Sequence, residues 1–527
     1  MINFLSYLKI IKHNQKMFDK VNISESNKII LVEFNRLASS IISYSYLVNV
    51  LSKKYNANVV AYRLTAKKNW IKDFIWKLIS KIFFLNTFQV YKSFGTKTFI
   101  CPNNINLDYK YKKRIRAIIK KIKNKNDLLN LKVDNIYIGD LIYDSYLMNF
   151  KQPTIDIKNN DFFLFLNHSL RTFFQWNIIF NKYKVQSVIV SHSVYTLAIP
   201  LRIAISKEIP SFQCSSQHLY KLSKKNIYAY REFFEYKKMF KKINKKVQKK
   251  AIFLAKKKIS KKFSGNDLAI GSTISAYKKV KLKKIIKKTK NIKVLIATHC
   301  FFDNPHPYGK NLFVDFHEWL DFLGKISKKT DYDWYIKLHP DYLKGTKDII
   351  KTYLNNYPNI TYVPSKYSHH QLIEEGIDVA LTCWGSIAHE YPLFNKLVVN
   401  SSINNPHINY KFSLNPKNIK VYKNILYNLK KYLNSTKKND IYEFYAMNFI
   451  LKKNWLIDNL NFMISNNRYG YYFQFKPSFY DYWIKKEFNQ KKHTLIQEDI
   501  SKFLKSNDYL INWNKIKINN FFNKNAK

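Results

Sequence analysis

The histidines of this chain gather in one region of the sequence. Seven of the 13 lie between positions 299 and 389, far more than an even spread would place there. In this region polar residues directly follow apolar runs that are typical of buried parallel strands. Because the carboxyl ends of such strands meet at one edge of a sheet, where open α/β folds bind ligands, we expect one binding crevice. The first residues assigned to it are His299, His339 and Thr382.

The segment Lys337-Leu-His-Pro340 has the residue types that bind phosphate. Lys337 and His339 occupy alternate positions, so both point to the same side of a strand, and both can donate hydrogen bonds to a phosphate oxygen. Pro340 ends the strand and fixes its exit. The other interpretation is a core histidine that a loop covers.

The segment Thr382–Glu390 (TCWGSIAHE) is the most informative motif. Glycine is rare in this chain, so Gly385 at a strand-to-helix turn indicates close backbone approach. Ser386 would begin a helix whose first N–H groups favour phosphate. Glu390 lies one turn further along the same face and can accept hydrogen bonds from two ribose hydroxyls. The alternative is an ordinary capped helix with an exposed glutamate.

The loop after the preceding strand carries Asp303, His306 and Gly309 between two prolines. Because it follows a strand, we expect it to face the crevice and to hold the sugar or the phosphate of a ligand. A tight surface loop is the other interpretation.

The first half of the chain offers candidates for a general base. His192 directly follows the apolar run Gln186–Ser191, and Asp140 and Asp144 follow a shorter run, four residues apart on one helical face. Either carboxylate, or the imidazole, could remove a proton from a hydroxyl group. A buried histidine and a capping aspartate are the structural alternatives. The loop 35–40 is a further element for binding a second substrate.

Strands and helices alternate twice along the chain. Expected strands in the first half are Lys28–Phe34, Asn58–Arg63, Gln186–Ser191 and Pro210–Gln213; in the second half they are Lys293–Ala297, Asp333–Leu338, Thr361–Val363, Asp378–Thr382 and Lys396–Asn400. This alternation predicts an α/β fold with two doubly wound Rossmann-like domains. We place them at 1–265 and 266–440, with a helical tail at 441–527 that packs back on the first domain.

Two of these motifs resemble known transferases. The segment Thr382–Glu390 resembles the donor-binding motif of GT-B glycosyltransferases, and KLHP resembles the HP motif of bacterial sialyl- and Kdo-type transferases. Cys300–Leu320, Ile138–Leu147 and Glu443–Met447 also resemble a family of surface-carbohydrate and capsule-biosynthesis proteins. The resemblance implies two domains facing a cleft, with His339 and Ser386 on the donor phosphate. The chain lacks the Asp-Asp/Glu-Gly base motif, so the base and the donor sugar stay open.

The resemblance implies a glycosyltransferase that moves a sugar from a CMP- or UDP-type nucleotide-sugar to a surface polysaccharide or glycolipid. We expect no cofactor beyond this substrate, and a metal-independent reaction, because no acidic triplet or zinc-type histidine spacing is evident. We also expect inversion at the anomeric carbon. The alternatives are a nucleotide-sugar 2-epimerase, a polyol-phosphate transferase and a non-catalytic capsule assembly or binding protein. Nucleic acid is not expected as a partner, because the lysines are spread throughout the chain.

The chain of 527 residues is strongly basic, with 91 Lys and Arg against 35 Asp and Glu, and a formal charge of +56. Either the charge binds an anionic partner such as a membrane surface, or it reflects an AT-rich genome whose codons favour lysine. The four scattered cysteines favour a reducing compartment. We expect a cytoplasmic protein, with the inner face of the plasma membrane as a second location; the basic amphipathic segment Phe74–Phe88 could lie in a membrane interface or in a core.

Overall fold

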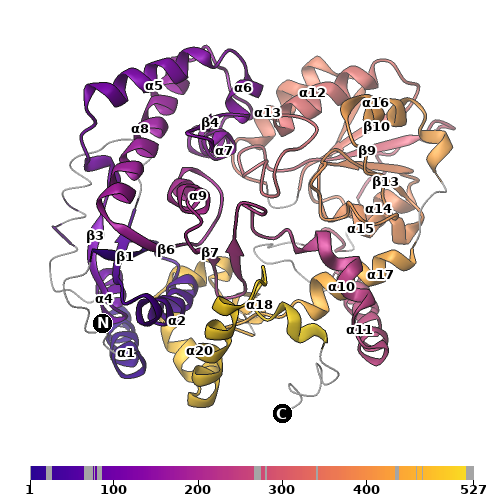
Figure 1. Ribbon diagram of the computed structural model, residues 1–527. Helices are drawn as coiled ribbons and strands as arrows, with labels where there is room; N and C mark the ends of the chain where they lie inside the picture. Colours follow the sequence, from indigo (N-terminus) through magenta and orange to yellow (C-terminus); the bar gives the residue numbers. More distant parts are fainter. Residues whose placement is uncertain are drawn as a thin grey trace. The chain divides into compact units, whose positions relative to one another are not determined.

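The computed structural model describes residues 2–18, 27–63, 75, 78–79, 86–265, 275–278, 282–339, 342–433, 438–458, 460–465 and 467–517. The chain divides into two compact units. Unit 1 comprises Met1–Asn149, Asp156–Ala229 and Lys453–Asn514, and unit 2 comprises Phe150–Ile155, Tyr230–Lys452 and Lys515–Lys527. Each unit is built around its own sheet (Figure 1).

The sheet of unit 1 has the strand order β3-β2-β1-β6-β7-β8. Neighbours from β3 to β7 run parallel, and β8 is antiparallel to β7. The strands are β1 (Lys28–Glu33), β2 (Asn58–Tyr62), β3 (Thr96–Ile100), β6 (Lys184–Val190), β7 (Ser211–Cys214) and β8 (Leu219–Leu222). The order reverses between β1 and β6, so the crevice at their carboxyl ends is the expected binding position in this unit.

Helices cover both faces of this sheet (Figure 1). They include α1 (Ile2–Met17), α2 (Ala38–Tyr55), α4 (Thr87–Ser93), α5 (Tyr109–Lys121), α7 (Gly139–Phe150), α8 (Asn160–Lys182) and α9 (Ile199–Ser206). Helix α2 carries a nearly continuous buried surface, because it lies between the sheet and further helices.

The C-terminal segment 453–514 completes unit 1. It contains α18 (Leu460–Ser465), α19 (Ser478–Tyr482) and α20 (Gln490–Lys505). Trp455, Phe479 and Ile500 join the core that α2 forms with β1 and β2. At the sheet edge Lys221 of β8 donates its backbone N–H to the Tyr509 carbonyl at 2.9 Å. The final segment therefore shares the core of the first sheet across a large sequence separation.

The sheet of unit 2 has the order β11-β10-β9-β12-β13, and all its described strand pairs are parallel. The strands are β9 (Lys293–Ala297), β10 (Asp333–Lys337), β11 (Ile360–Val363), β12 (Val379–Thr382) and β13 (Leu397–Asn400). This is the doubly wound order, and it reverses between β9 and β12.

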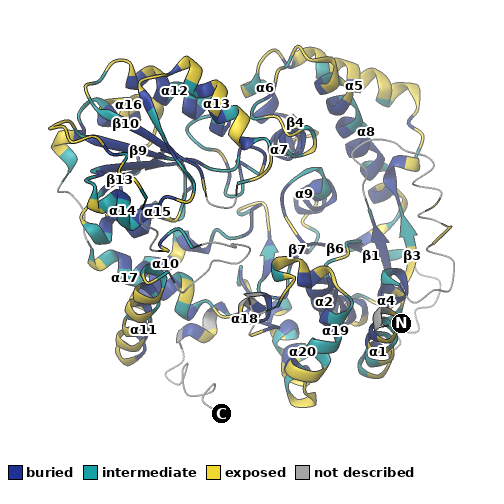
Figure 2. Cartoon of the chain, turned by 180° about the vertical axis from the view of Figure 1, so that it is seen from behind, coloured by how far each residue is buried: buried dark blue, intermediate teal, exposed yellow. Residues whose placement is uncertain are grey.

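Alternate residues of these strands enter separate cores. Val294 and Ile296 of β9 pack into one core with helices α12 (Phe316–Ser327), α13 (Thr346–Asn356) and α16 (Ile419–Tyr427). Leu295, between them, packs into a second core with α14 (His369–Glu374) and α15 (Ile387–Glu390). The period of two puts successive side chains on opposite faces, and Figure 1 shows these helices on the two sides of the sheet. In both units most strand residues are buried, and exposed residues lie on outward surfaces such as those of α5 and α11 (Lys245–Phe263) (Figure 2).

The predicted fold class, α/β with two doubly wound Rossmann-like sheets and a helical C-terminal segment, is confirmed. The division along the chain differs from the predicted bounds of 265 and 440. Residues 230–263 belong to unit 2, because α11 packs against α17 (Asn439–Tyr445) and the π-helix η6 (Ala446–Leu451). Residues 441–452 belong to unit 2 for the same reason.

Most of the segment Phe74–Phe88, on which the membrane-interface interpretation rested, lies outside the described residues. No helix in the described ranges is long and apolar enough to cross a bilayer.

Gly139, the first residue of α7, leaves no room for a side chain. A Cβ atom at this position would lie 2.2 Å from the carbonyl oxygen of Leu128 and 2.6 Å from that of Leu129. We therefore expect Gly139→Ala to lower the free energy of unfolding of unit 1 by about 2 kcal/mol, as overpacked sites do. Urea denaturation measures it. Asn149→Ala, at an exposed position of the same helix, is the control, and equal midpoints for the two variants would contradict the steric argument.

Candidate functional site

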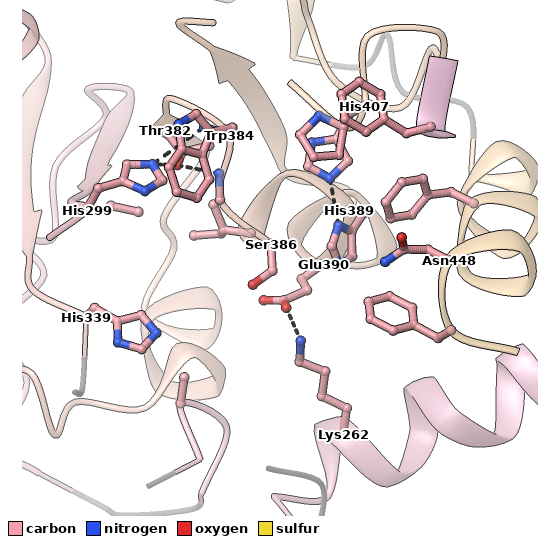
Figure 3. A pocket seen from close by; sticks show the side chains of 18 of the residues that line it. Lys262, His299, His339, Thr382, Trp384, Ser386, His389, Glu390, His407 and Asn448 are labelled. Carbon is pink, nitrogen blue, oxygen red and sulfur yellow. Dashed lines mark hydrogen bonds and ion pairs between the residues drawn. The ribbon is translucent and has the colours of Figure 1, made fainter. Parts of the chain in front are cut away.

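A pocket of about 540 Å³ opens at the carboxyl edge of the second sheet, and all its lining residues belong to unit 2. It lies where the strand order reverses, between β9 and β12. Figure 3 shows side chains that line it. Predicted site residues in its lining are His299, Lys337, His339, Thr382, Gly385, Ser386 and Glu390. The carboxyl ends of β9, β10 and β12 therefore form one crevice, as the sequence indicated. Pro340 lies outside the described residues.

His299 ties the ends of β9 and β12 together. Its Nε2 lies 2.9 Å from Oγ1 of Thr382 and accepts the backbone N–H of Cys383 at 3.2 Å. The ring stacks on Phe316, with centroids 4.7 Å apart. Burial, with a smaller contribution from His339, lowers the pKa of His299 to about 3. This imidazole is therefore neutral, and its Nε2 lone pair is used to hold the β12 turn.

Gly385 permits the turn after β12 to close. Its N–H donates to Oγ1 of Thr382 at 3.1 Å. A Cβ atom at position 385 would lie 2.7 Å from that same oxygen and 3.5 Å from Cε1 of His299. The sequence indicated that another group lies close to the backbone of this glycine. In the structure that group is the side chain of Thr382.

The helix that Ser386 was expected to begin is a single turn. α15 spans Ile387–Glu390 and continues as the 3-10 helix η4 (Tyr391–Phe394), and Ser386 makes no side-chain cap. A macrodipole needs several aligned peptides, so the predicted dipole contribution at this position is small. Ser386 is exposed, and Figure 3 shows its hydroxyl beside the Glu390 carboxylate.

Glu390 is buried and already paired. One carboxylate oxygen contacts the ammonium of Lys262 from α11, and the other accepts the Tyr277 hydroxyl at 3.0 Å. Burial alone would raise the pKa of Glu390, but the ion pair with Lys262 outweighs it and the pKa is lowered. The anionic carboxylate thus faces the pocket with partners that compete for the predicted contact with ribose. Lys262 and Tyr277 were not predicted, since they are more than a hundred residues away along the chain.

Lys337 and His339 line the pocket from the end of β10. Lys337 is 2 % exposed, and its ammonium donates to the Ser365 carbonyl at 2.9 Å. Burial lowers the pKa of Lys337 to about 8. His339 is exposed, and its ring points into the pocket (Figure 3). The alternate spacing therefore brings both side chains to the same cavity.

Two further histidines of the pocket form a hydrogen-bonded pair that was not predicted. Nδ1 of His389 lies 2.8 Å from Nε2 of His407, and both rings pack on Phe444 (Figure 3). Burial is the main cause that lowers both pKa values well below the ordinary range. A neutral pair shares one proton in this bond. His407 lies outside the predicted cluster, so only the fold reveals the pair.

The remaining wall comes from residues around the π-helix η6. Asn448 accepts the Tyr236 hydroxyl at 2.6 Å. Lys452 forms an ion pair with the buried Glu232, and its ammonium lies 5.2 Å above the ring of Tyr230. π-helical turns are rare and are frequent at functional sites. The sequence segment 443–447, singled out by resemblance, enters this turn.

The loop after β9 does not contribute the predicted residues. Asp303 is exposed, His306 is buried, and neither lines the pocket. Tyr308 lines it instead. Because the two prolines and the positive φ of Asn304 and Gly309 turn the loop repeatedly, strand-end position alone did not predict which side chain faces the cavity.

Asp140 is buried and is hydrogen-bonded to two neighbouring side chains of unit 1. Its carboxylate accepts hydrogen bonds from the guanidinium of Arg202 at 2.7 Å and from the Tyr228 hydroxyl at 2.8 Å. The residue is 3 % exposed. Asp144 is also buried on α7. The apolar run before α7 forms only β5 (Ile136–Tyr137), which pairs with β4 (Lys132–Val133) outside the large sheet. The strand-end argument for these two carboxylates was therefore wrong.

His192, in contrast, lies at the switch point of unit 1. It is exposed, and its Nδ1 lies 2.9 Å from Oγ of Ser191. Ser191 follows β6 and contacts the buried carboxylate of Glu33, the last residue of β1, through its hydroxyl at 2.8 Å and its N–H at 2.5 Å. Glu33 and Ser191 were not predicted, although a lone carboxylate at the end of the apolar run 28–34 was a visible signal.

These contacts determine the tautomer of His192. The Ser191 hydroxyl has one proton, and the buried carboxylate of Glu33 is its strongest acceptor. The Ser191 oxygen is then the acceptor for His192, so the imidazole proton resides on Nδ1. In the neutral ring, Nε2 is then the nitrogen that carries the lone pair, and this is the atom that a general base would use.

The backbone that follows His192 is strained. Tyr195 has φ 62° and ψ 169°. Only glycine adopts this region readily, and other residues in it store about 1–3 kcal/mol, most often at functional sites.

No protein-family model and no curated protein matches the sequence. Solved structures with some likeness include UDP-GlcNAc 2-epimerase from Neisseria meningitidis bound to UDP-GlcNAc, at 12% identity over 80% of this chain and 94% of that chain, TM-score 0.21. A glycosyltransferase from Rickettsia africae ESF-5 has 10% identity, coverage of 81% and 95%, and TM-score 0.24. The wall teichoic acid polymerase TagF has 12% identity, coverage of 96% and 99%, and TM-score 0.21. TM-scores this low carry no information about function.

The tautomer of His192 is testable by heteronuclear NMR of labelled imidazoles, with His192→Asn assigning the signal. We expect the Nδ1-protonated form in the wild type. In Ser191→Ala the ring loses its acceptor and should shift toward the Nε2-protonated form. Ser206→Ala, a serine on α9 that bonds within its own helix, is the control. An unchanged signal in Ser191→Ala would contradict the hydrogen-bond assignment.

Proposed function

We propose that this chain is a glycosyltransferase whose unit 2 binds a CMP- or UDP-type nucleotide-sugar in the pocket between β9 and β12. The observation that carries the proposal is the buried ammonium of Lys337. The carboxylates of Glu390 and Glu232 are paired with Lys262 and Lys452, whereas the partners described for Lys337 are carbonyl oxygens. A buried ammonium without a counter-ion is costly, so this arrangement favours an anionic ligand such as a phosphate.

The proposed donor contacts follow from the lining of the pocket. Lys337 and His339 would bind the phosphate, with the Ser386 hydroxyl beside them. Glu390 would accept a ribose hydroxyl with the lone pairs that Lys262 and Tyr277 do not use. The neutral His389–His407 pair and the aromatic wall would contact the uncharged portion of the donor.

The proposed reaction is a direct, inverting displacement. The acceptor hydroxyl attacks the anomeric carbon, the bond from that carbon to the phosphate oxygen breaks, and its electron pair leaves with the nucleotide. Lys337 and His339 would stabilise the developing negative charge. We propose His192 as the general base, with the proton of its neutral ring on Nδ1 and Nε2 taking the hydroxyl proton. We propose that the reaction needs no metal ion and no cofactor beyond the donor.

The proposed acceptor is a surface polysaccharide or a glycolipid, and the proposed place of reaction is the cytoplasmic face of the plasma membrane. Product analysis distinguishes transfer from the alternatives. A 2-epimerase would release an epimerised nucleotide-sugar without an acceptor, and a polyol-phosphate transferase would require a CDP-linked polyol.

Donor binding tests the proposal directly. Calorimetric titration with CMP, UDP, GDP and CDP should identify at least one ligand. His339→Ala should weaken the best of them about tenfold or more, because a charge-assisted hydrogen bond to phosphate is lost. His317→Ala, on α12 and outside this pocket, is the matched control. Absence of binding by all four nucleotides, or equal affinity of the two variants, would contradict the proposal.

The pH dependence of binding provides a second test. The charged form of Lys337 attracts phosphate, and its pKa is lowered to about 8, so the ammonium is present below that pH and is lost above it. Nucleotide affinity should therefore fall as the pH rises from about 7.5 to 9.5. Lys337→Met should bind weakly, with little change over the same range. An equally steep fall in Lys337→Met would assign the titration to another group.

A further inference from the structure

A surface segment of unit 1 exposes several large aromatic side chains. It runs from α18 through the 3-10 helix η7 (Gly470–Phe475) to Lys476. The exposed fractions are 65 % for Phe462, 39 % for Tyr469, 40 % for Tyr471, 70 % for Tyr472 and 46 % for Phe475. We call these five residues the aromatic patch. Such a concentration of exposed rings is unusual, because each would be more stable away from water.

The segment is anchored from beneath. Met463, Ile464 and Phe473 are buried in the core of unit 1, and α18 packs against η7. The rings of Tyr471, Tyr472 and Phe475 lie 6.1 to 6.4 Å from one another. Tyr471, Tyr472 and Phe475 therefore form a connected outward surface on a segment that is packed into the core.

The charged side chains within the segment are all cationic. Arg468 and Lys476 lie above the ring of Tyr469, at 4.7 and 5.0 Å from its centroid. The sequence has no Asp or Glu between Asp458 and Asp481, and the whole chain has a formal charge of +56. An anionic surface is the complementary partner.

We propose that the aromatic patch inserts into the interface of an anionic lipid membrane. Tyrosine suits this interface because its ring enters the acyl boundary while its hydroxyl stays at the headgroup level. Arg468 and Lys476 would contact the lipid phosphates. Nucleic acid is less compatible, since a strand is held by a line of cations along its backbone, whereas this patch has two cations for five rings. The proposal is independent of the reaction assigned to unit 2.

Sedimentation with lipid vesicles tests the proposal. The wild type should bind vesicles that contain phosphatidylglycerol and should bind pure phosphatidylcholine weakly. A variant with Tyr472→Ser and Phe475→Ser should lose about tenfold or more in affinity for the anionic vesicles, and Phe462→Ser alone should show a smaller loss in the same direction. Tyr109→Ser is the matched control, because Tyr109 is a 72 % exposed tyrosine on α5 of the same unit, next to lysines.

Circular dichroism and the urea midpoint establish that each variant is folded, which is expected because the replaced side chains lie at the surface. Wild-type protein that does not bind anionic vesicles would overturn the proposal. So would equal affinity of the wild type, the patch variants and Tyr109→Ser, which would indicate general charge attraction. A single-stranded oligonucleotide completes the test: patch variants that lose oligonucleotide binding and keep vesicle binding would assign the surface to nucleic acid instead.

Discussion

One neutral imidazole holds the carboxyl edge of the second sheet in shape. His299 accepts hydrogen bonds from Thr382 and from the Cys383 backbone, and so connects the end of β9 to the turn after β12. The turn can approach this closely only because residue 385 has no side chain. The position of Ser386 and Glu390 depends on that turn. Burial keeps the ring uncharged, so its lone pair remains available for this purpose at any pH in the physiological range.

The architecture was predictable because parallel strands buried on both faces appear as short apolar runs. The runs that contain β1, β2, β6, β9, β10, β12 and β13 were identified from sequence with nearly the observed bounds. β3 (TKTFI) was missed because it is an edge strand in which Lys97 and Thr98 are exposed. The run before Asp140 was misinterpreted, because two residues of strand outside the main sheet have the same local pattern as a core strand.

The site was predictable only where its residues follow strands. His339, Thr382, Gly385 and His192 each lie at the end of a strand or within three residues of it, so strand order alone places them at a sheet edge. Lys262 and Tyr277 reach the pocket from segments that carry no recognisable motif, and only tertiary packing determines their position. The same holds for Glu33 and Ser191, whose contact joins residues 158 positions apart. The segment that enters the π-helix was noticed by resemblance, which did not predict its place in the pocket wall.

The left-handed backbone at Tyr195 has an energetic consequence for the loop after β6. A tyrosine held at φ 62° is less stable than the same residue at negative φ, and the surrounding packing offsets the difference. Any ligand whose arrival lets this peptide relax would gain that free energy in addition to its own contacts. The packing around the loop beside His192 therefore has to supply the free energy that keeps this peptide in its strained conformation.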